Sequence, residues 1–241
     1  MKGIILAGGK GTRLYPSTYA ISKQLLTVYN KPMIYYPLKT LIDMGIKDIL
    51  IITADETQCQ LFETQFKDLY FEQEVNLTFA IQYKPGGIPE AFIIGEHFIG
   101  NDDVVLVLGD NVIITPQKLT TKPNTIYTYK VKNPQAYGVA LIEDGKLVSI
   151  VEKPEKYIGD NAVIGLYTFT NTAVRIAKTL KVSKRNELEI VDVIDQINKL
   201  EGLNIQELDG FWFDCGNHDD LLECANLIKA IEHRTGKRVG V

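Results

Sequence analysis

KGIILAGGKGTRL, residues 2–14, joins a short apolar segment directly to a glycine-rich turn. The apolar segment shows no polar alternation, which predicts a strand buried on both faces of a parallel sheet. In such sheets ligands bind beyond the carboxyl ends of the strands, so the turn lies where a ligand is expected. The three glycines let the backbone approach a polyphosphate, and Arg13 adds a planar charge suited to phosphate oxygens. We interpret residues 8–13 as a phosphate-binding loop.

A glycine-rich hairpin with Arg13 facing solvent is the alternative interpretation of this turn. The turn lacks the Walker pattern G-x-x-x-x-G-K-[ST] and the dinucleotide pattern G-x-G-x-x-G. A Rossmann oxidoreductase is therefore disfavoured.

Three more apolar segments follow in the first half of the chain and predict buried strands at Ile49–Thr53, Leu77–Gln82 and Val104–Leu108. Amphipathic helical patterns lie between them, at Pro32–Met44, Thr57–Phe66 and Pro89–Phe98. For the first of these helices, Asn30 is the expected cap, Gly45 the expected end, and Pro37 the expected cause of a kink.

The pattern changes after about residue 120, where short turns such as Asp144-Gly145 separate the segments. Expected strands are Thr125–Val131, Tyr137–Glu143, Lys146–Glu152, Ala162–Phe169, Ile205–Leu208 and Phe211–Phe213. Expected helices are Ala173–Leu180, Leu188–Leu200 and a last helix from about Asn217, with Leu221, Leu222, Ala225, Ile228 and Ile231 on one face.

These segments predict a Rossmann-like α/β fold with a mixed, mainly parallel sheet flanked by helices and a smaller antiparallel lobe. No linker rich in proline, glycine or serine divides the chain. We therefore expect one domain over residues 1–241, with halves at 1–120 and 121–241 that share a core.

Composition narrows the function class. The formal net charge of −4 and the pI near 5.5 argue against nucleic acid as a partner. The three cysteines form no C-x-x-C pair, no signal-peptide layout opens the chain, and no apolar run is long enough for a membrane span. We expect a cytoplasmic protein with reduced thiols and no membrane partner.

Two motifs in the first half of the chain contain further candidate catalytic or metal-binding residues, which we expect beside the glycine-rich loop. Lys23 follows it in SKQLL, residues 22–26, where it is suited to neutralising charge on a phosphorus under attack; a surface lysine is the alternative. Asp110 follows a buried strand and Gly109, so its carboxylate is expected to point into the crevice as a Mg²⁺ ligand; a simple Asp-Asn turn is the alternative.

Two motifs of the second half complete the candidates. Asp214 lies between an aromatic strand and the last helix, as a second metal ligand or as a helix cap. Glu152 and Lys153 end a strand, where the carboxylate suits sugar hydroxyls and the lysine a monophosphate; a solvated strand end is the alternative.

Taken together, these residues resemble the sugar-phosphate nucleotidylyltransferase family, and in particular its short subgroup that transfers thymidylyl groups to glucose 1-phosphate. The resemblance runs from Met1 to about Ile231. Its motifs are KGIILAGG-GTRLYP (2–16), SKQLL (22–26), KPMIYYPL (31–38), AFIIGE (91–96), LGDN (108–111), EKP (152–154), AVIGLY (162–167), ELEI (187–190) and FWFDCGNH (211–218).

The resemblance implies a role for each matching residue. Catalysis would fall to Arg13, Lys23, Asp110 and Lys153. The nucleotide would be bound by Leu6, Gly8, Gly9, Gly11, Thr12, Arg13, Gln24, Gln82, Gly87 and Asp110. The sugar phosphate would be bound by Asn111, Gly138, Glu152, Lys153, Val163 and Tyr167. Asp110 and Asp214 would share the Mg²⁺ cofactor.

The implied reaction is Mg²⁺-dependent, in-line displacement that converts dTTP and α-D-glucose 1-phosphate into dTDP-glucose and pyrophosphate, for deoxysugar biosynthesis, in a homo-oligomer. Transfer from UTP or to another sugar 1-phosphate, and a non-catalytic nucleotide-sugar sensor, remain alternatives.

The chain departs from the family pattern in three places. Thr27 replaces a usual proline, and Pro89-Glu90 replaces a usual Ala-Gln after the glycine expected to read the base. The chain also resembles relatives without the C-terminal helices that build a regulatory nucleotide site, so we expect no such site.

Overall fold

The computed structural model describes residues 1–67 and 75–240, and it confirms the mixed α/β fold. Four parallel strands form the centre of the main sheet, in the order β6, β1, β4, β5. Their bounds are β1 Lys2–Leu6, β4 Asp48–Thr53, β5 Asn76–Ile81 and β6 Val104–Leu108. All four carboxyl ends therefore reach the same edge of the sheet.

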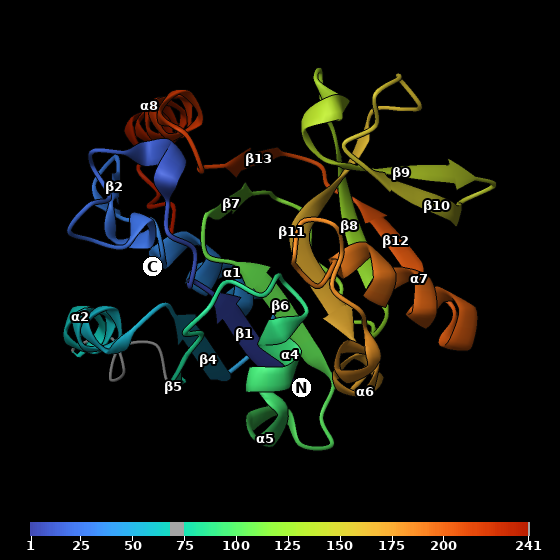
Figure 1. The fold of residues 1–241 in the computed structure, drawn as a ribbon. Helices are drawn as coiled ribbons and strands as arrows, with labels where there is room; N and C mark the ends of the chain where they lie inside the picture. The colour runs from blue at the N-terminus through green and yellow to red at the C-terminus, as the bar shows by residue number, and fades with distance from the viewer. Residues whose placement is uncertain (68–74, 241) are drawn as a thin grey trace.

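The second half of the chain continues this sheet with antiparallel pairing, giving nine strands within the described residues (Figure 1). Strand β11 pairs with β6, β8 and β9, and β10 and β12 extend the sheet from β9 and β8. The bounds are β8 Thr125–Lys130, β9 Gly138–Glu143, β10 Lys146–Glu152, β11 Asn161–Phe169 and β12 Asn204–Glu207.

Strand β11 has different neighbours along its length. Its end, residues 166–169, pairs with β6, whereas Ala162 near its start pairs with β9. The pairing of β11 with β8 shifts register between Val163 and Tyr167. The sheet therefore forks along β11, and a cavity lies on this side of the fork between strands β9–β11 and the segment of residues 185–194.

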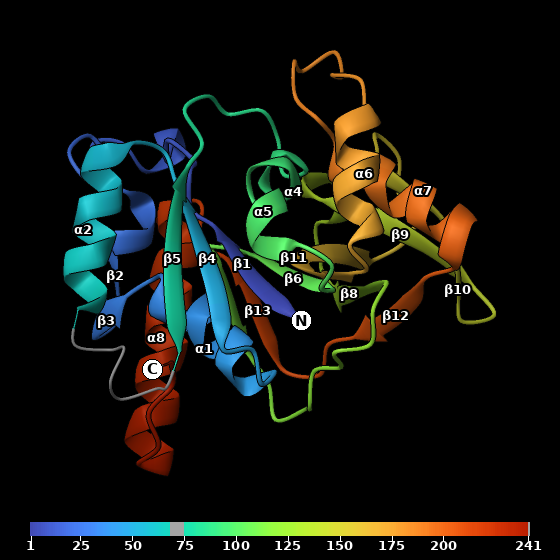
Figure 2. The same ribbon diagram turned by 90° about the horizontal axis from the view of Figure 1, so that it is seen from below.

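Alternate residues of the central strands enter two cores, as a period of two requires. Ile5, Ile51 and Val107 pack on one face against α1 Tyr35–Asp43 and α2 Glu56–Phe66. Ile4, Ile52 and Leu106 pack on the other face against α4 Glu90–Ile94, α6 Thr172–Thr179 and α7 Ile190–Glu201. Figure 2 shows α2 and α4 on opposite faces of β5, β4 and β1.

Smaller elements complete the fold. The hairpin β2 Thr27–Val28 with β3 Lys31–Pro32 packs against α8 His218–Thr235, and β7 Asn111–Ile114 pairs with β13 Phe211–Asp214. The remaining pieces are α5 Glu96–Ile99 and the 3₁₀ turns η1 Thr12–Leu14, η2 Lys23–Leu25 and η3 Pro134–Ala136. In the part of the chain described, no helix is long and apolar enough to cross a membrane.

The strands expected at Val104–Leu108 and Lys146–Glu152 are confirmed to the residue, and the other expected strands and most helices lie within one or two residues of their predicted bounds. Three expectations about the helix at 32–44 are wrong: its first residue, its cap and the kink at Pro37. The helix begins at Tyr35, because Lys31 and Pro32 pair with β2 instead. Asn30 does not cap it but donates a hydrogen bond to Glu232.

Pro37 lies in the first turn of α1, where its missing N–H has no helical acceptor, so the predicted kink has no cause. The helix expected at 89–98 is divided at Gly95 into α4 and α5. Leu222 of α8 is exposed rather than part of the packed face. Strand β7 was not predicted, since its four residues give little signal alone.

The packing of the core predicts how much stability the protein loses when a buried side chain beside β11 is truncated. Leu106 is fully buried on β6, so Leu106→Ala should lower the free energy of unfolding by about 2–5 kcal/mol. Leu222 is 63% exposed and supplies the matched control: Leu222→Ala should change the free energy of unfolding by less than about 0.5 kcal/mol. Urea unfolding followed by Trp212 fluorescence measures both, and equal effects would contradict the assignment of the core.

Candidate active site

A lysine–aspartate pair lies where the carboxyl ends of β1 and β6 meet. Gly109 and Asp110 continue β6, and Lys23 comes from η2. Lys23 Nζ donates a hydrogen bond to Asp110 Oδ2, and both side chains are largely buried. Gly109 is needed at this point because a Cβ there would lie 3.0 Å from the Gln24 Cγ and the Leu6 carbonyl oxygen.

A second carboxylate, Asp214 at the end of β13, belongs to the same cluster. Strand β13 runs antiparallel to β7, and their register pairs Asp214 with Asn111. The backbone N–H of Cys215 donates to the Asp110 carbonyl at 2.9 Å, which fixes the two aspartates side by side. Residues from opposite ends of the chain therefore share one electrostatic site.

The two aspartates titrate in opposite directions. Burial disfavours the charge on Asp110, but the Lys23 charge and hydrogen bonds from Lys23 and Asn111 outweigh it, so the pKa of Asp110 lies below its usual value. Burial and the charge of Asp110 raise the pKa of Asp214 to about 6, against the opposing charges of Arg13 and Lys23. Burial and the charge of Asp110 together therefore outweigh the two nearby cations in their effect on the Asp214 carboxyl group.

Arg13 lies at the open side of this cluster. It is in η1, which starts after Gly11, a residue with φ 63°. Its guanidinium lies 3.9 Å from Asp214 Oδ2, and 63% of the side chain is exposed. The missing side chain of Gly216 makes room for it, since a Cβ there would lie 2.5 Å from Arg13 Nη2.

Asn111 ties this cluster to β11. Its Oδ1 accepts hydrogen bonds from the Gly165 N–H at 2.9 Å and from Trp212 Nε1 at 2.6 Å. Its Nδ2 donates to Asp110 Oδ1 at 3.1 Å. The residue expected near the sugar thus also fixes the position of Asp110.

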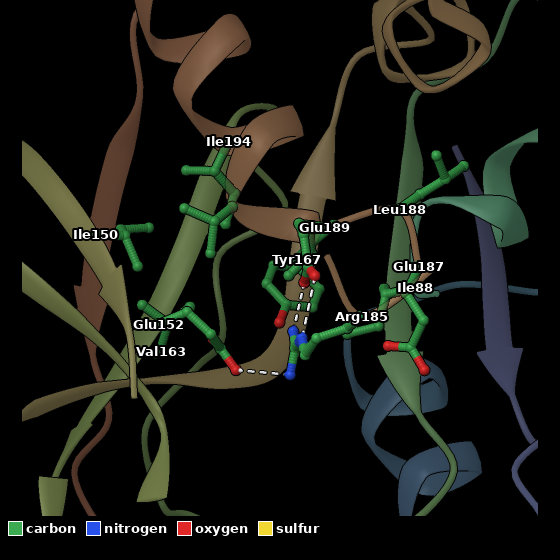
Figure 3. A pocket seen from close by; sticks show the side chains of 13 residues that line it. Ile88, Ile150, Glu152, Val163, Tyr167, Arg185, Glu187, Leu188, Glu189 and Ile194 are labelled. Atoms are coloured by element: carbon green, nitrogen blue, oxygen red, sulfur yellow. Dashed lines mark hydrogen bonds and ion pairs between the residues drawn. The ribbon is translucent and has the colours of Figure 1, made fainter. Parts of the chain in front are cut away.

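A separate cavity of about 130 Å³ lies in the fork of the sheet (Figure 3). Gly138, Glu152, Val163 and Tyr167, which the resemblance places around the sugar phosphate, all line it. A Cβ on Gly138 would lie 3.0 Å from Glu152 Oε2, so glycine leaves room for this carboxylate. The structure brings these four residues together.

Arg185 enters the same cavity and was not predicted from the sequence. Its Nη2 lies 2.5 Å from Glu189 Oε2, and its Nη1 lies 3.6 Å from Glu152 Oε1, as the dashed lines of Figure 3 show. Arg185 precedes the ELEI motif in an irregular segment without hydrophobic periodicity. The only sequence signal was its closeness to that motif.

Lys153 lies next to this cavity rather than in its lining. It follows β10 with φ 47°, and its N–H donates to the Tyr137 carbonyl at 3.0 Å. With Glu152, Arg185 and Glu189 it lines an open groove of about 480 Å³. Lys153 is therefore a further cation beside the same carboxylates.

A third group of predicted residues surrounds the end of β5. Gln82 is 6% exposed, and its side chain faces Gly8, where a Cβ would lie 2.7 Å from Gln82 Oε1. Gly87 forms an isolated bridge with Leu188, and the Leu188 N–H donates to the Gly86 carbonyl at 2.8 Å. This bridge connects the β5 segment to the cavity, which Ile88 and Leu188 both line.

The remaining predicted residues lie around the glycine-rich loop. Leu6 ends β1, Thr12 begins η1, and Gly9 lies against Lys23, whose Nζ is 3.8 Å from the Cβ position of Gly9. Gln24 is buried, and its Oε1 accepts a hydrogen bond from Ser22 at 2.6 Å. They adjoin the Lys23–Asp110 pair.

The two carboxylates suit a hard divalent cation that is also coordinated by other ligands, such as phosphate oxygens or water. Asp110 and Asp214 are two adjacent carboxylates, the hard oxygen ligands that Mg²⁺ prefers together with substrate phosphates and water. Among the described residues no group of three or more histidine, cysteine or acidic side chains is placed to hold a metal alone.

Known proteins resemble this chain over nearly all its length. The family model described as nucleotidyl transferase matches residues 2–230. Glucose-1-phosphate thymidylyltransferase from Neisseria meningitidis is 46% identical over 97% of this chain and 84% of its own length. The protein of that name from Mycolicibacterium smegmatis is 45% identical over 100% and 86%.

Solved structures agree with these relatives. A Bacillus anthracis protein described as a glucose-1-phosphate thymidylyltransferase, in complex with sucrose, superposes with a TM-score of 0.86 at 37% identity, covering 94% of both chains. A UDP-glucose pyrophosphorylase superposes with a TM-score of 0.82 at 24% identity, over 95% and 98%, which supports the fold alone.

The raised pKa of Asp214 predicts a pH-dependent gain on removing its charge. Asp214→Asn should raise the free energy of unfolding without metal by about 1–3 kcal/mol at pH 8. The pKa of Asp214 is higher in the folded than in the unfolded state, so a proton on Asp214 stabilises the folded wild-type protein at low pH. The wild-type protein loses this stabilisation as pH rises through about 6. The gain should shrink at pH 5 and vanish below about pH 4.

Urea unfolding in EDTA at pH 8 and pH 5 measures this gain. Asp209→Asn, at an exposed carboxylate between β12 and β13, is the matched control and should show little change at either pH. An equal gain from Asp214→Asn at both pH values would mean that its charge is not the cause.

Proposed function

The chain belongs to the nucleotidyl transferase family, and we propose that it transfers a thymidylyl group from dTTP to α-D-glucose 1-phosphate, releasing pyrophosphate and dTDP-glucose. The observation that carries the proposal is the cluster of Arg13, Lys23, Asp110 and Asp214, joined through Asn111 to the cavity in the fork. The relatives' shared name supports the choice of dTTP and glucose 1-phosphate.

The substrates divide between the halves of a single domain. Residues 1–120 bind the triphosphate, with the glycine-rich loop at the phosphates and Gln82 with the Gly87 backbone at the base. Residues 121–241 bind the sugar phosphate, with Glu152, Val163 and Tyr167 around the sugar. Lys153 and Arg185 lie beside Glu152 at the rim of the cavity, where they bind the phosphate group of the sugar phosphate.

The reaction is an in-line displacement. An oxygen of the sugar phosphate attacks the α-phosphorus of dTTP, the bond to the β-phosphate oxygen breaks, and pyrophosphate leaves. The attacking phosphate is already an anion near neutral pH, so no side chain must remove a proton. The task of the site is to hold two anions in contact and aligned.

Cations on the chain overcome this repulsion. Lys23 is held beside Asp110 and Gly9, where it meets charge developing at the α-phosphate. Arg13, largely exposed beside Asp214, has room to bind the departing pyrophosphate. Mg²⁺ held by Asp110 and Asp214 would add positive charge on the phosphate oxygens.

A grid of nucleotides and sugar 1-phosphates, followed by pyrophosphate release, tests the function. We expect the highest kcat/KM with dTTP and glucose 1-phosphate in the presence of Mg²⁺. EDTA, or Asp110→Asn, should lower turnover by at least about 100-fold. Absence of pyrophosphate release with every pair, or a clear preference for UTP, would contradict the proposal.

Lys153→Ala tests the division of substrates. Loss of one charged contact to phosphate should raise KM for glucose 1-phosphate about 10–100-fold, since hydrogen bonds to charged groups contribute about 1.5–3 kcal/mol. KM for dTTP should change less than about 3-fold because the two sites are separate. Lys156→Ala, exposed in the same segment, is the control. Equal changes in both KM values would rule out the role.

A further inference from the structure

Arg185 is held by Glu189 through two hydrogen bonds. Arg185 Nε donates to Glu189 Oε1 at 3.1 Å, and Arg185 Nη2 donates to Glu189 Oε2 at 2.5 Å. A bidentate contact of this kind fixes the plane of the guanidinium as well as its position, which a single contact would not do. Both residues lie in the irregular segment before α7, so they are not paired merely as neighbours on one helix face.

Glu189 is itself held in place by Ser183. Ser183 Oγ donates to Glu189 Oε1 at 2.6 Å and accepts from the backbone N–H of Arg185 at 3.1 Å. The hydrogen bond from Arg185, and after it that from Ser183, keeps the pKa of Glu189 below its usual value, although burial opposes them. Glu189 therefore stays a carboxylate, and both of its oxygens hold Arg185.

The pair leaves one end of the guanidinium turned toward the cavity (Figure 3). Arg185 Nη1 lies 3.6 Å from Glu152 Oε1, which is too far for a hydrogen bond. Among the described residues Nη1 makes no hydrogen bond, so its two N–H groups stay available to an anionic ligand. Lys153 lines the groove beside it, so a second cation is close to the same place.

We propose that Glu189 is a positioning residue that orients Arg185 toward the phosphate group of the sugar 1-phosphate. This inference rests on the proposed function, in which Arg185 binds that phosphate. The role opposes the simple effect of charge, because a carboxylate near an anion site repels the anion and its removal should strengthen binding. A positioning role predicts weaker binding instead, because the guanidinium is no longer held in one orientation before the ligand arrives.

Glu189→Gln removes the bidentate contact at nearly constant shape. The new amide keeps one oxygen acceptor, and its nitrogen would face the N–H donors of Arg185. We expect KM for glucose 1-phosphate to rise at least about 5-fold, since hydrogen bonds to charged groups are strong. The values of kcat and of KM for dTTP should stay within about 3-fold, because the contact serves sugar-phosphate binding. Initial rates of pyrophosphate release measure all three.

A double-mutant cycle with Arg185→Ala separates positioning from direct contact with the substrate. Arg185→Ala alone should raise KM for glucose 1-phosphate. Adding Glu189→Gln to Arg185→Ala should leave this KM unchanged or lower it, because only the repulsive charge of Glu189 then remains to be removed. A further rise as large as that in the otherwise wild-type chain would mean that Glu189 acts independently of Arg185, which overturns the inference. A rise smaller than about 5-fold in folded Glu189→Gln, or a fall, overturns it too.

Asp195→Asn is the matched control. Asp195 is an exposed carboxylate of α7 that pairs with Lys199, so the variant makes the same chemical change nearby and should leave both KM values unchanged. Ser183→Ala is the second variant should Glu189→Gln fold poorly by thermal denaturation. It removes the hydroxyl that holds Glu189 and should raise KM for glucose 1-phosphate at least about 3-fold. An unchanged KM in folded Ser183→Ala would contradict the role.

Calorimetric binding separates this inference from the proposed function. The Kd of glucose 1-phosphate is measured on the whole chain without nucleotide, so it requires no turnover. A wild-type chain that binds glucose 1-phosphate but releases no pyrophosphate would refute the function, and the Kd of Glu189→Gln would then decide the inference by the same 5-fold criterion. A wild-type chain that makes dTDP-glucose and keeps its KM for glucose 1-phosphate in Glu189→Gln would refute only the inference.

Discussion

The candidate site is built on two buried carboxylates, Asp110 and Asp214, which the fold holds side by side at the end of the parallel sheet although their charges destabilise it. The ion pair with Lys23 keeps the pKa of Asp110 low, because burial by itself would raise it. Burial, and after it the charge of Asp110, raises the pKa of Asp214, and two adjacent carboxylates are the hard oxygen ligands that suit a divalent cation.

The fork of the sheet places a cavity, the proposed sugar-phosphate site, near these carboxylates. Strand β11 pairs with β9 near its start and with β6 at its end, and the cavity is lined by β9, β10, β11 and the segment of residues 185–194. Two connections cross the opening: Asn111 reaches the Gly165 backbone, and Gly87 bridges to Leu188. The residues proposed to contact the base, the α-phosphate and the sugar are therefore connected through the fold, which suits a reaction whose rate depends on alignment.

Much of the site was predictable because its residues follow buried strands. The glycine-rich loop after β1 and Asp110 after β6 were readable from continuous apolar runs and from the rule that parallel strands share one ligand-binding edge. Arg185 was not, since it lies in an irregular segment and reaches the cavity only through the fold. The start of α1 was misplaced for a similar reason: the β2–β3 hairpin takes Lys31 and Pro32 out of the helix, and a two-residue strand leaves no periodic signal.

The sequence by itself determined the alternation of strands and helices and the order of the motifs, because these depend on local periodicity and on residue types. Only the tertiary structure decided that Asp214, at the far end of the chain, lies beside Asp110, that β11 forks the sheet, and that Gln82 donates a hydrogen bond to Glu90. These relations depend on strand register and on side-chain contacts between segments distant in sequence. Electrostatic and hydrogen-bond energies depend on the distance between groups in space. The separation of two residues along the chain does not give that distance.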